Sequence, residues 1–338
     1  MDPIILTITD IRQETKEAST FFLQPNVPVD YQPGQFITLL VRHVRRSFSL
    51  SSTPGEGPLA ITVKRKTNGE VSRYLLDHVK VGDTLSALPP AGRFTFTPQP
   101  GAKRDIGFIA AGSGIAPILP LARQALRTEP GSHVWLLYQN HSERDVIFAG
   151  ILDDLVKQNP DRFTLVYFLS APDDHHTLPR RLGNASLEQI IPDLLRFAPE
   201  DALFFCCGPE SLMRMARFTL RVLNFRADQF RQEHFTVDVR PPAPLLTDNS
   251  PKTVTLRHGD RTSSFTVAYP ENILQAALEH HIHLPYSCRG GRCSTCAVRC
   301  VSGRVVMSIN DVLTDQDLKD GWVLTCTGYA ATDLELEV

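Results

Sequence analysis

Four cysteines near the end of the chain restrict its fold more than any other feature. Cys288, Cys293 and Cys296 lie in one short segment and Cys326 follows later, so four of the seven cysteines have the spacing C-x4-C-x2-C-x29-C. Four thiolates at this spacing bind a [2Fe–2S] cluster. Two glycines between the first two cysteines let the loop fold closely round an inorganic core and bring backbone N–H groups to the sulfurs. The pattern predicts a [2Fe–2S] site whose fourth ligand comes from a distant strand.

Two other interpretations of these cysteines remain as alternatives. A structural zinc site prefers two C-x2-C pairs, and the chain has one. A disulfide framework is typical of short secreted chains, whereas this chain has 338 residues and no signal-like start. Cys300 is predicted to be a spare apolar residue in a strand. The histidines at 280, 281 and 283 suggest a metal or Rieske-type site, but four correctly spaced cysteines make histidine ligands unnecessary.

The composition is that of an ordinary globular protein of two or three domains, with 42% apolar residues. The net charge is −2, and the basic residues do not gather in one stripe of the sequence. We therefore expect no nucleic-acid partner. No apolar run reaches the length of about 18 residues that a membrane span needs. Cysteines without a disulfide framework indicate a reducing compartment, and we expect a cytoplasmic protein.

The first hundred residues alternate between short apolar segments and turns. Such closely spaced short strands indicate an antiparallel β-barrel, which we assign to residues 1–101. The predicted strands cover residues 4–9, 20–23, 35–41, 47–51 and 59–64.

One of these strands carries the motif Arg46-Ser47-Phe48-Ser49. An arginine can bind a phosphate through two parallel hydrogen bonds. Phe48 offers a flat face for an aromatic ring, and Ser49 can hydrogen-bond a heteroatom at the edge of that ring. Taken singly, each of these residues could be an ordinary strand residue.

A second motif, Gly69-Glu-Val-Ser72, opens a predicted helix that runs to residue 78. The N-terminus of a helix presents free N–H groups and the positive end of the helix dipole, which suits a phosphate. Ser72 can add a hydroxyl donor.

R-x-[YF]-S followed by G-x-x-S resembles the flavin-binding signature of the ferredoxin–NADP reductase superfamily, and Pro89-Pro-Ala-Gly92-Arg-Phe94 resembles its P-x-G-x-F segment. Phe48 departs from the usual tyrosine, so a hydroxyl that often reaches the flavin ribityl chain is lost. The resemblance implies FAD, with FMN as the alternative. The flavin-binding residues that it implies are Arg46, Ser47, Phe48, Ser49, Val63, Lys64, Gly69, Val71 and Ser72.

Residues 102–238 change to apolar strands that alternate with helices. This alternation predicts βαβ units and a parallel sheet, whose ligands bind at the carboxyl ends of the strands. The predicted strands are 106–111, 133–138, 163–169 and 202–206, and the predicted helices are 117–126, 149–157, 187–195 and 210–223.

Two loops at strand ends resemble the superfamily's G-[TS]-G-I-A-P and C-G-P motifs, which mark its nicotinamide nucleotide domain. Without that resemblance the first loop is weak evidence, because it lacks the full G-x-G-x-x-G fingerprint, and Cys207 could be a small buried residue, as we expect of Cys206. The resemblance implies that Cys207 lies close to the nicotinamide. The nucleotide-binding residues that it implies are Gly112, Ser113, Gly114, Pro117, Cys207, Gly208 and Pro209.

Glu233 and Phe235 resemble the superfamily's terminal acidic–aromatic segment, in which the aromatic ring lies near the flavin. We therefore expect the catalytic set to be Ser49, Cys207, Glu233 and Phe235. The choice between NADH and NADPH stays open, because the loop at 170–181 holds both acidic and basic residues.

Residues 239–251 are proline-rich and form a predicted semi-rigid linker. The pattern of residues 252–338 then predicts a hairpin (253–257 and 263–268), a helix (272–280), the cysteine loop and strands at 297–301, 323–325 and 334–338. This order resembles the β-grasp fold of plant-type ferredoxins, which is an α+β fold. Arg289 and Arg292 beside the cluster form the expected face for a partner.

The three predicted domains cover nearly the whole chain and resemble the self-contained reductases of multicomponent oxygenases and hydroxylases. The resemblance implies an enzyme that passes electrons from NAD(P)H through FAD to the [2Fe–2S] cluster and then to a protein acceptor, an oxygenase or hydroxylase component. Two other functions remain open: a reductase of small acceptors such as free flavin or a quinone, and a redox-sensing flavin and iron–sulfur module.

Overall fold

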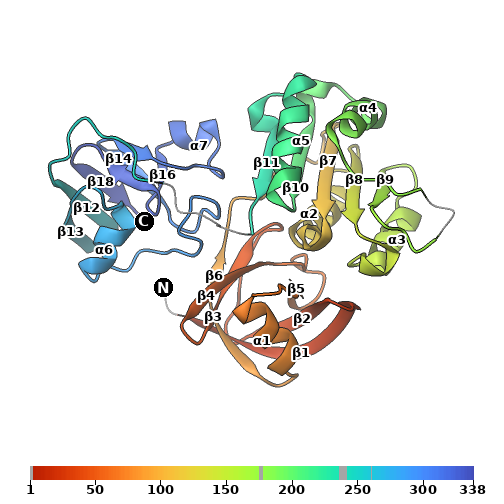
Figure 1. Ribbon diagram of the computed structural model, residues 1–338, viewed down its shortest axis with the longest axis horizontal. Helices are drawn as coiled ribbons and strands as arrows, with labels where there is room; N and C mark the ends of the chain where they lie inside the picture. The colour runs from red at the N-terminus through yellow and green to blue at the C-terminus, as the bar shows by residue number, and fades with distance from the viewer. Residues whose placement is uncertain (1–2, 175–177, 236–241, 260) are drawn as a thin grey trace. The chain divides into compact units, whose positions relative to one another are not determined.

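The computed structural model describes residues 3–174, 178–235, 242–259 and 261–338. Contacts divide the chain into two compact units, Met1–Glu233 and His234–Val338. In Figure 1 the first unit runs in colour from red to green, and the second unit runs from teal to blue. Among the described residues no helix is long and apolar enough to cross a bilayer.

The first sheet of unit 1 is the predicted antiparallel barrel. Its six strands follow the order β4-β3-β6-β1-β2-β5, and a bridge between Leu50 and Ile61 joins the two ends of that order. Alternate strand residues face inward, so the barrel encloses an apolar core. The elements are β1 (Ile4–Thr15), β2 (Ala18–Pro25), β3 (Phe36–Val41), β4 (Val44–Ser49), β5 (Leu59–Lys64), α1 (Glu70–His78) and β6 (Thr84–Ala91).

Strand β6 is absent from the sequence-based prediction, because Pro89 and Pro90 lie within it. Proline cannot donate to a strand ladder and is tolerated at bulges. Here the register against β3 shifts between Phe36, which pairs with Ala91, and Thr38. The prolines fall at this irregularity, so the strand can continue past them.

The second sheet of unit 1 is fully parallel, as predicted, with the order β11-β10-β7-β8-β9. Helices α2 and α3 pack in the core on one face, and α4 and α5 pack in the core on the other. Its strands are β7 (Asp105–Ala111), β8 (His133–Asn140), β9 (Phe163–Leu169), β10 (Leu203–Cys207) and β11 (Phe230–Glu233), and its helices are α2 (Ile115–Thr128), α3 (Ala149–Gln158), α4 (Asn184–Leu194) and α5 (Glu210–Val222). Short 3-10 helices are η1 (Gly112–Gly114), η2 (Glu143–Asp145), η3 (Pro199–Asp201) and η4 (Ala227–Gln229).

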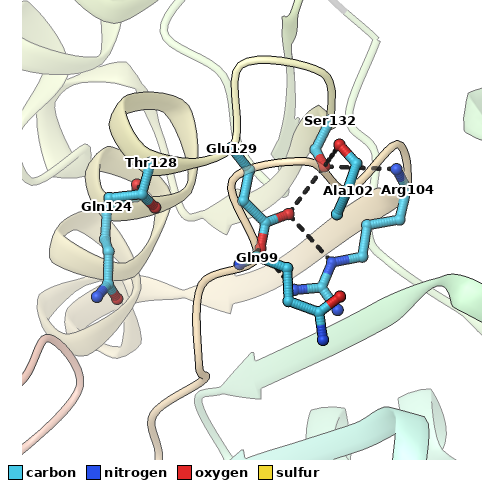
Figure 2. A network of polar contacts seen from close by, with 7 residues as sticks. All are labelled: Gln99, Ala102, Arg104, Gln124, Thr128, Glu129 and Ser132. Atoms are coloured by element: carbon cyan, nitrogen blue, oxygen red, sulfur yellow. Dashed lines mark hydrogen bonds and ion pairs between the residues drawn. The ribbon is translucent and has the colours of Figure 1, made fainter.

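A buried ion pair ties the start of β7 to the end of α2 (Figure 2). Arg104 donates from Nε and Nη2 to the two carboxylate oxygens of Glu129, at 3.1 and 2.5 Å. The backbone N–H of Gln99 and the hydroxyl of Ser132 donate to the same carboxylate, both at 2.8 Å. Burial alone would raise the pKa of Glu129, but these donors hold it below its ordinary value. The network fixes the segment that leads from the barrel into the parallel sheet.

Unit 2 contains a mixed five-stranded sheet in the order β13-β12-β18-β14-β16 and a small sheet of β15 and β17. Helix α6 contributes its apolar face to the core of this unit, and the Asn272 side chain caps its N-terminus by accepting from Gln275 N. The elements are β12 (Lys252–His258), β13 (Arg261–Val267), α6 (Ile273–Glu279), β14 (Ala297–Ser302), β15 (Val305–Met307), α7 (Asp315–Lys319), β16 (Trp322–Leu324), β17 (Gly328–Ala330) and β18 (Leu334–Glu337).

The structure corrects one detail of the cysteine prediction. Cys326 lies in the turn between β16 and β17 and not within a strand. The run 323–327 is apolar enough to resemble a strand, but its backbone turns at residue 325. The turn places the buried Cys326 thiol beside the cysteine loop, where Gly291 N donates to it at 3.4 Å, and this position suits a ligand.

Candidate cofactor sites

The two loops predicted to bind the nucleotide touch each other at the carboxyl ends of neighbouring strands. A side chain on Gly114 would place its Cβ 2.0 Å from the carbonyl oxygen of Cys207, and one on Gly208 would come within 3.2 Å of the Cβ of Ala111. Strands β7 and β10 are paired here, with Cys207 opposite Ala110. The backbones therefore approach so closely that only glycine fits at position 114.

Side chains from two other strands reach the Gly112 turn. The Tyr138 hydroxyl donates to the Gly112 carbonyl at 2.9 Å, and burial raises the pKa of Tyr138, so it remains a donor. Gly112 has a φ of +51°, and the ammonium of Lys64 lies 3.5 Å from where a Cβ on it would stand. Lys64 thus brings a cation from the barrel to the loop that is predicted to bind the nucleotide. The hydrophobic run 133–138 gave no signal that Tyr138 would serve this loop.

Strand β4 carries the predicted flavin residues Arg46, Ser47, Phe48 and Ser49. Arg46 is half-buried, and its burial lowers the pKa of the guanidinium. Ser47 exchanges a hydrogen bond of 2.9 Å with Thr38. Phe48 is half-buried and packs against the barrel core.

The side chains of Val63 and Val71 are 0% and 4% exposed and belong to the barrel core. Only their main-chain atoms are left for a ligand.

Helix α1 begins directly after Gly69, which has no side chain that could cap it. The Ser72 hydroxyl donates to the Gly69 carbonyl at 3.2 Å and accepts from Lys66 N at 3.3 Å, so it stabilises the turn before the helix. A Cβ on Gly69 would meet the Ser72 oxygen at 2.4 Å. The tight turn leaves the helix N-terminus open for an anion.

Three of the four predicted catalytic residues are brought together. The Ser49 hydroxyl donates to Oε2 of Glu233 at 2.9 Å, and Glu233 is paired with Cys207 across β10 and β11. Burial raises the pKa of Glu233 to about 8, and the Ser49 hydrogen bond lowers it less. Burial, followed by the nearby Glu233 carboxyl, raises the pKa of Cys207. The Glu233 carboxyl and the Cys207 thiol are therefore both buried and neutral near pH 7.

Phe235, the fourth residue, is 36% exposed. The residues that follow it, 236–241, lie outside the described part of the chain and include the start of the predicted linker.

The loop that bears on the choice of nucleotide holds an ion pair. Arg144 binds the carboxylate of Asp173, and the guanidinium of Arg180 lies over the Phe168 ring, 4.9 Å from its centroid. Residues 175–177 of this loop are not described. Asp173, an acidic residue that could favour NADH, and Arg180, a basic residue that could favour NADPH, therefore both have partners within the protein.

In unit 2 the four predicted ligands gather in one place. Cys293, Cys296 and Cys326 are 9%, 2% and 4% exposed, and Cys288 is half-buried. Their sulfurs are joined by three hydrogen bonds in a row, Cys293 with Cys288, Cys288 with Cys326, and Cys326 with Cys296. Cys300 lies in β14, where its thiol donates to the Ser302 carbonyl at 3.4 Å.

Backbone N–H groups point at these sulfurs. Cys288 N donates to Cys293 Sγ, Gly290 N to Cys288 Sγ and Gly291 N to Cys326 Sγ, each at 3.4 Å. Hydrogen bonds from Cys293, then Cys326, lower the pKa of Cys288, and the same contacts raise the pKa of Cys293 and of Cys326, so the sulfurs titrate as one group.

Within the described residues no group of three or more His, Cys, Asp or Glu side chains is arranged to hold a single metal ion. A [2Fe–2S] cluster needs only two thiolates per iron, and the four neighbouring sulfurs with their N–H donors fit it.

Comparison with known proteins matches each part of the chain to a family. Residues 5–96 match the oxidoreductase FAD-binding domain, residues 108–217 the oxidoreductase NAD-binding domain and residues 257–331 the 2Fe-2S iron-sulfur cluster binding domain. These matches confirm FAD, a nicotinamide nucleotide and a [2Fe–2S] cluster as the cofactors, and they identify the chain as an oxidoreductase.

Two curated relatives match along almost their whole length. The ferredoxin reductase component of 3-ketosteroid-9-alpha-monooxygenase from Mycobacterium tuberculosis is 35% identical, over 97% of this chain and 93% of the relative. A component of the 1,2-phenylacetyl-CoA epoxidase from Escherichia coli is 31% identical, over 97% of this chain and 95% of the relative.

The solved structure of phthalate dioxygenase reductase shows the same three-domain fold. It has a TM-score of 0.60 and 22% identity, and the match covers 99% of this chain and 98% of that one. The chain therefore belongs to the ferredoxin–NADP reductase superfamily, among the members that carry a C-terminal [2Fe–2S] domain and pass electrons from NAD(P)H through FAD to that cluster.

Proposed function

We propose that this protein is the reductase component of an oxygenase or hydroxylase system and delivers electrons one at a time to a protein acceptor. The contact between Ser49 and Glu233 carries the proposal, because it brings a predicted flavin residue of the barrel next to Cys207 at the end of the nucleotide sheet. Both curated relatives named above belong to oxygenase or epoxidase systems, which supports an acceptor of that class.

The flavin would lie against β4 and the start of α1. Arg46 would bind its phosphates together with the open N-terminus of α1, and Phe48 would stack on an aromatic ring. Ser49 would hydrogen-bond the edge of the ring system. The proposed contacts also include Ser47, Val63, Lys64, Gly69, Val71 and Ser72.

The nicotinamide nucleotide would bind over the touching loops, with its phosphates close to the backbone at Gly112, Ser113 and Gly114. Lys64 would add a positive charge, and Cys207 would lie beside the nicotinamide. Glu233, neutral near pH 7, would hold a proton at this position without repelling the incoming ring. The other proposed contacts are Pro117, Gly208, Pro209 and Phe235.

The four thiolates Cys288, Cys293, Cys296 and Cys326 would hold the cluster, two on each iron. Flavin exchanges electrons in ones or twos and the cluster in ones, so together they convert a two-electron donor into a one-electron source. What the protein supplies is position: N–H donors for the sulfurs and a half-buried Cys288 near the surface.

The proposed domain limits are 1–101 for the flavin barrel, 102–238 for the nucleotide domain, 239–251 for the linker and 252–338 for the ferredoxin domain. We place the protein in the cytoplasm, because its cysteines would serve as free thiolate ligands there.

Replacing one ligand tests the proposal. In Cys293→Ser we expect NAD(P)H to reduce the flavin as in the wild type, while electron delivery to a protein acceptor is lost. Cys300→Ser is the matched control, since Cys300 lies in β14 and is not one of the four proposed ligands, and it should keep full delivery. Unchanged delivery by Cys293→Ser would instead favour a reductase of small acceptors that bypasses the cluster.

A further inference from the structure

The segment 308–313 lies against the cysteine loop and is bound to it at two points. Asp311 N donates to the Gly291 carbonyl at 3.1 Å. Arg292 Nε donates to Asp311 Oδ2 at 3.1 Å, and the two side chains are only 18% and 24% exposed. A Cβ on Gly291 would also lie 2.7 Å from the Ile309 carbonyl oxygen. The segment and the loop are therefore in tight contact, and their ion pair is partly shielded from water.

The same segment is anchored beside the fourth cysteine. The Thr327 hydroxyl donates to the Ile309 carbonyl at 2.8 Å, and Ser308 N donates to the Thr327 carbonyl at 2.9 Å. Within the segment, the Asn310 side chain accepts from Leu313 N at 2.8 Å and keeps it compact. The segment thus forms a rigid bridge between the turn that carries Cys326 and the loop that carries the other three ligands.

Gly291 is the point at which this bridge meets the cluster site. Its N–H donates to Cys326 Sγ at 3.4 Å, and its φ is +72°. Glycine has no side chain to restrict its backbone, so residue 291 does not by itself hold this N–H in place. The contacts with Ile309 and Asp311 must do so. Hydrogen bonds to cluster sulfurs stabilise the reduced, more negative state and raise the reduction potential.

We propose that the Arg292–Asp311 ion pair is a positioning device that holds the Gly291 N–H against Cys326 Sγ and thereby raises the reduction potential of the [2Fe–2S] cluster. The inference rests on the cluster ligands of the proposed function. The two side chains act through the Gly291 backbone. They would set how readily the cluster accepts an electron from the flavin.

Asp311→Ala separates this role from simple electrostatics. Removing a negative charge near the cluster would by itself favour the reduced state and raise the potential. Loss of the positioning contact has the opposite effect, so we expect the potential to fall by about 59 mV, a tenfold shift in the ratio of oxidised to reduced cluster. Asp311→Asn can still accept a hydrogen bond from Arg292, so its potential should be equal to or above that of the wild type.

The measurement is a spectroscopic redox titration of the cluster in the full-length protein with its cofactors bound. Asp315→Ala, which removes an exposed acid at the start of α7, controls for the loss of one negative charge in the same unit. The rate of iron loss to a chelator is measured alongside and should rise in Asp311→Ala but not in Asp311→Asn.

A potential in Asp311→Ala that is unchanged or raised would overturn the proposal. Cluster loss in both the Ala and the Asn variant would overturn it as well, because the hydrogen bond would then not be what matters. A wild-type protein without any cluster signal would contradict the proposed ligands themselves, and so the two failures are distinguishable.

Discussion

The Ser49 hydroxyl donates a 2.9 Å hydrogen bond to the Glu233 carboxyl, although the two residues are 184 positions apart in the chain. Ser49 ends β4 of the barrel, and Glu233 ends β11 of the parallel sheet. Both side chains are buried, at 5% and 7% exposure. The contact joins the barrel to the parallel sheet, and the burial of Glu233 at this junction gives it an unusual protonation state.

Glu233 should make the stability of the protein depend on pH. Burial raises its pKa to about 8 in the folded state, whereas an unfolded glutamate titrates near about 4.3. The folded state thus keeps a proton that the unfolded state has lost. The free energy of unfolding therefore falls as pH rises between these values, by up to about 1.4 kcal/mol per pH unit.

Glu233→Gln removes this contribution, so the variant should lose less stability than the wild type between pH 5 and 8. Thermal unfolding of the cofactor-free protein at several pH values measures it. Glu200→Gln makes the same chemical change at an exposed site and should leave the wild-type slope intact. Identical slopes in Glu233→Gln and the wild type would mean that Glu233 is ionised at neutral pH.

Gly114→Ala should weaken nucleotide binding, because its Cβ would lie 2.0 Å from the Cys207 carbonyl oxygen and force the two loops apart. We expect a stability loss of about 1–3 kcal/mol and a raised KM for the nicotinamide nucleotide. Steady-state kinetics and thermal unfolding report the two effects. Gly150→Ala is the control, since nothing lies within 4 Å of its Cβ position in α3, and it should be neutral or slightly stabilising. Wild-type KM in Gly114→Ala would argue against a nucleotide over this loop.

Glu129→Gln should destabilise unit 1 strongly, because it leaves the Arg104 guanidinium, 10% exposed, without its carboxylate partner. Loss of one partner of a buried pair costs about 3–5 kcal/mol. Chemical denaturation measures the loss. Asp228→Asn breaks the exposed pair with Arg226 and should cost less than about 1 kcal/mol. Equal losses of stability in the two variants would show that burial does not increase the contribution of the Arg104–Glu129 pair to the free energy of unfolding.

Local patterns in the sequence were enough to predict the order of the domains, the parallel sheet and the cysteine loop. The βαβ alternation and the glycine loops depend on interactions between residues that are close in the sequence. Local patterns are therefore enough to predict them. The loop at Gly112–Gly114 lies between β7 and α2 as predicted, and Asn272 caps α6 at the predicted start of that helix.

Contacts between distant residues could not be predicted from such patterns. The pairing of Ser49 with Glu233 depends on how two domains pack, and that of Arg292 with Asp311 on a loop with no regular structure. Strand β6 was missed because its prolines indicate a turn, and only the bulge opposite them makes a strand possible. The short strands β15 and β17, of three residues each, are also absent from the sequence-based prediction.

The most direct test of the electron path is an anaerobic titration of the purified, cofactor-loaded protein with NADH and, in parallel, with NADPH. At least one nucleotide should bleach the flavin absorption first and the [2Fe–2S] absorption after it. The more effective nucleotide identifies the physiological donor. If neither nucleotide reduces either centre, the assignment of this chain as an NAD(P)H-dependent reductase is contradicted.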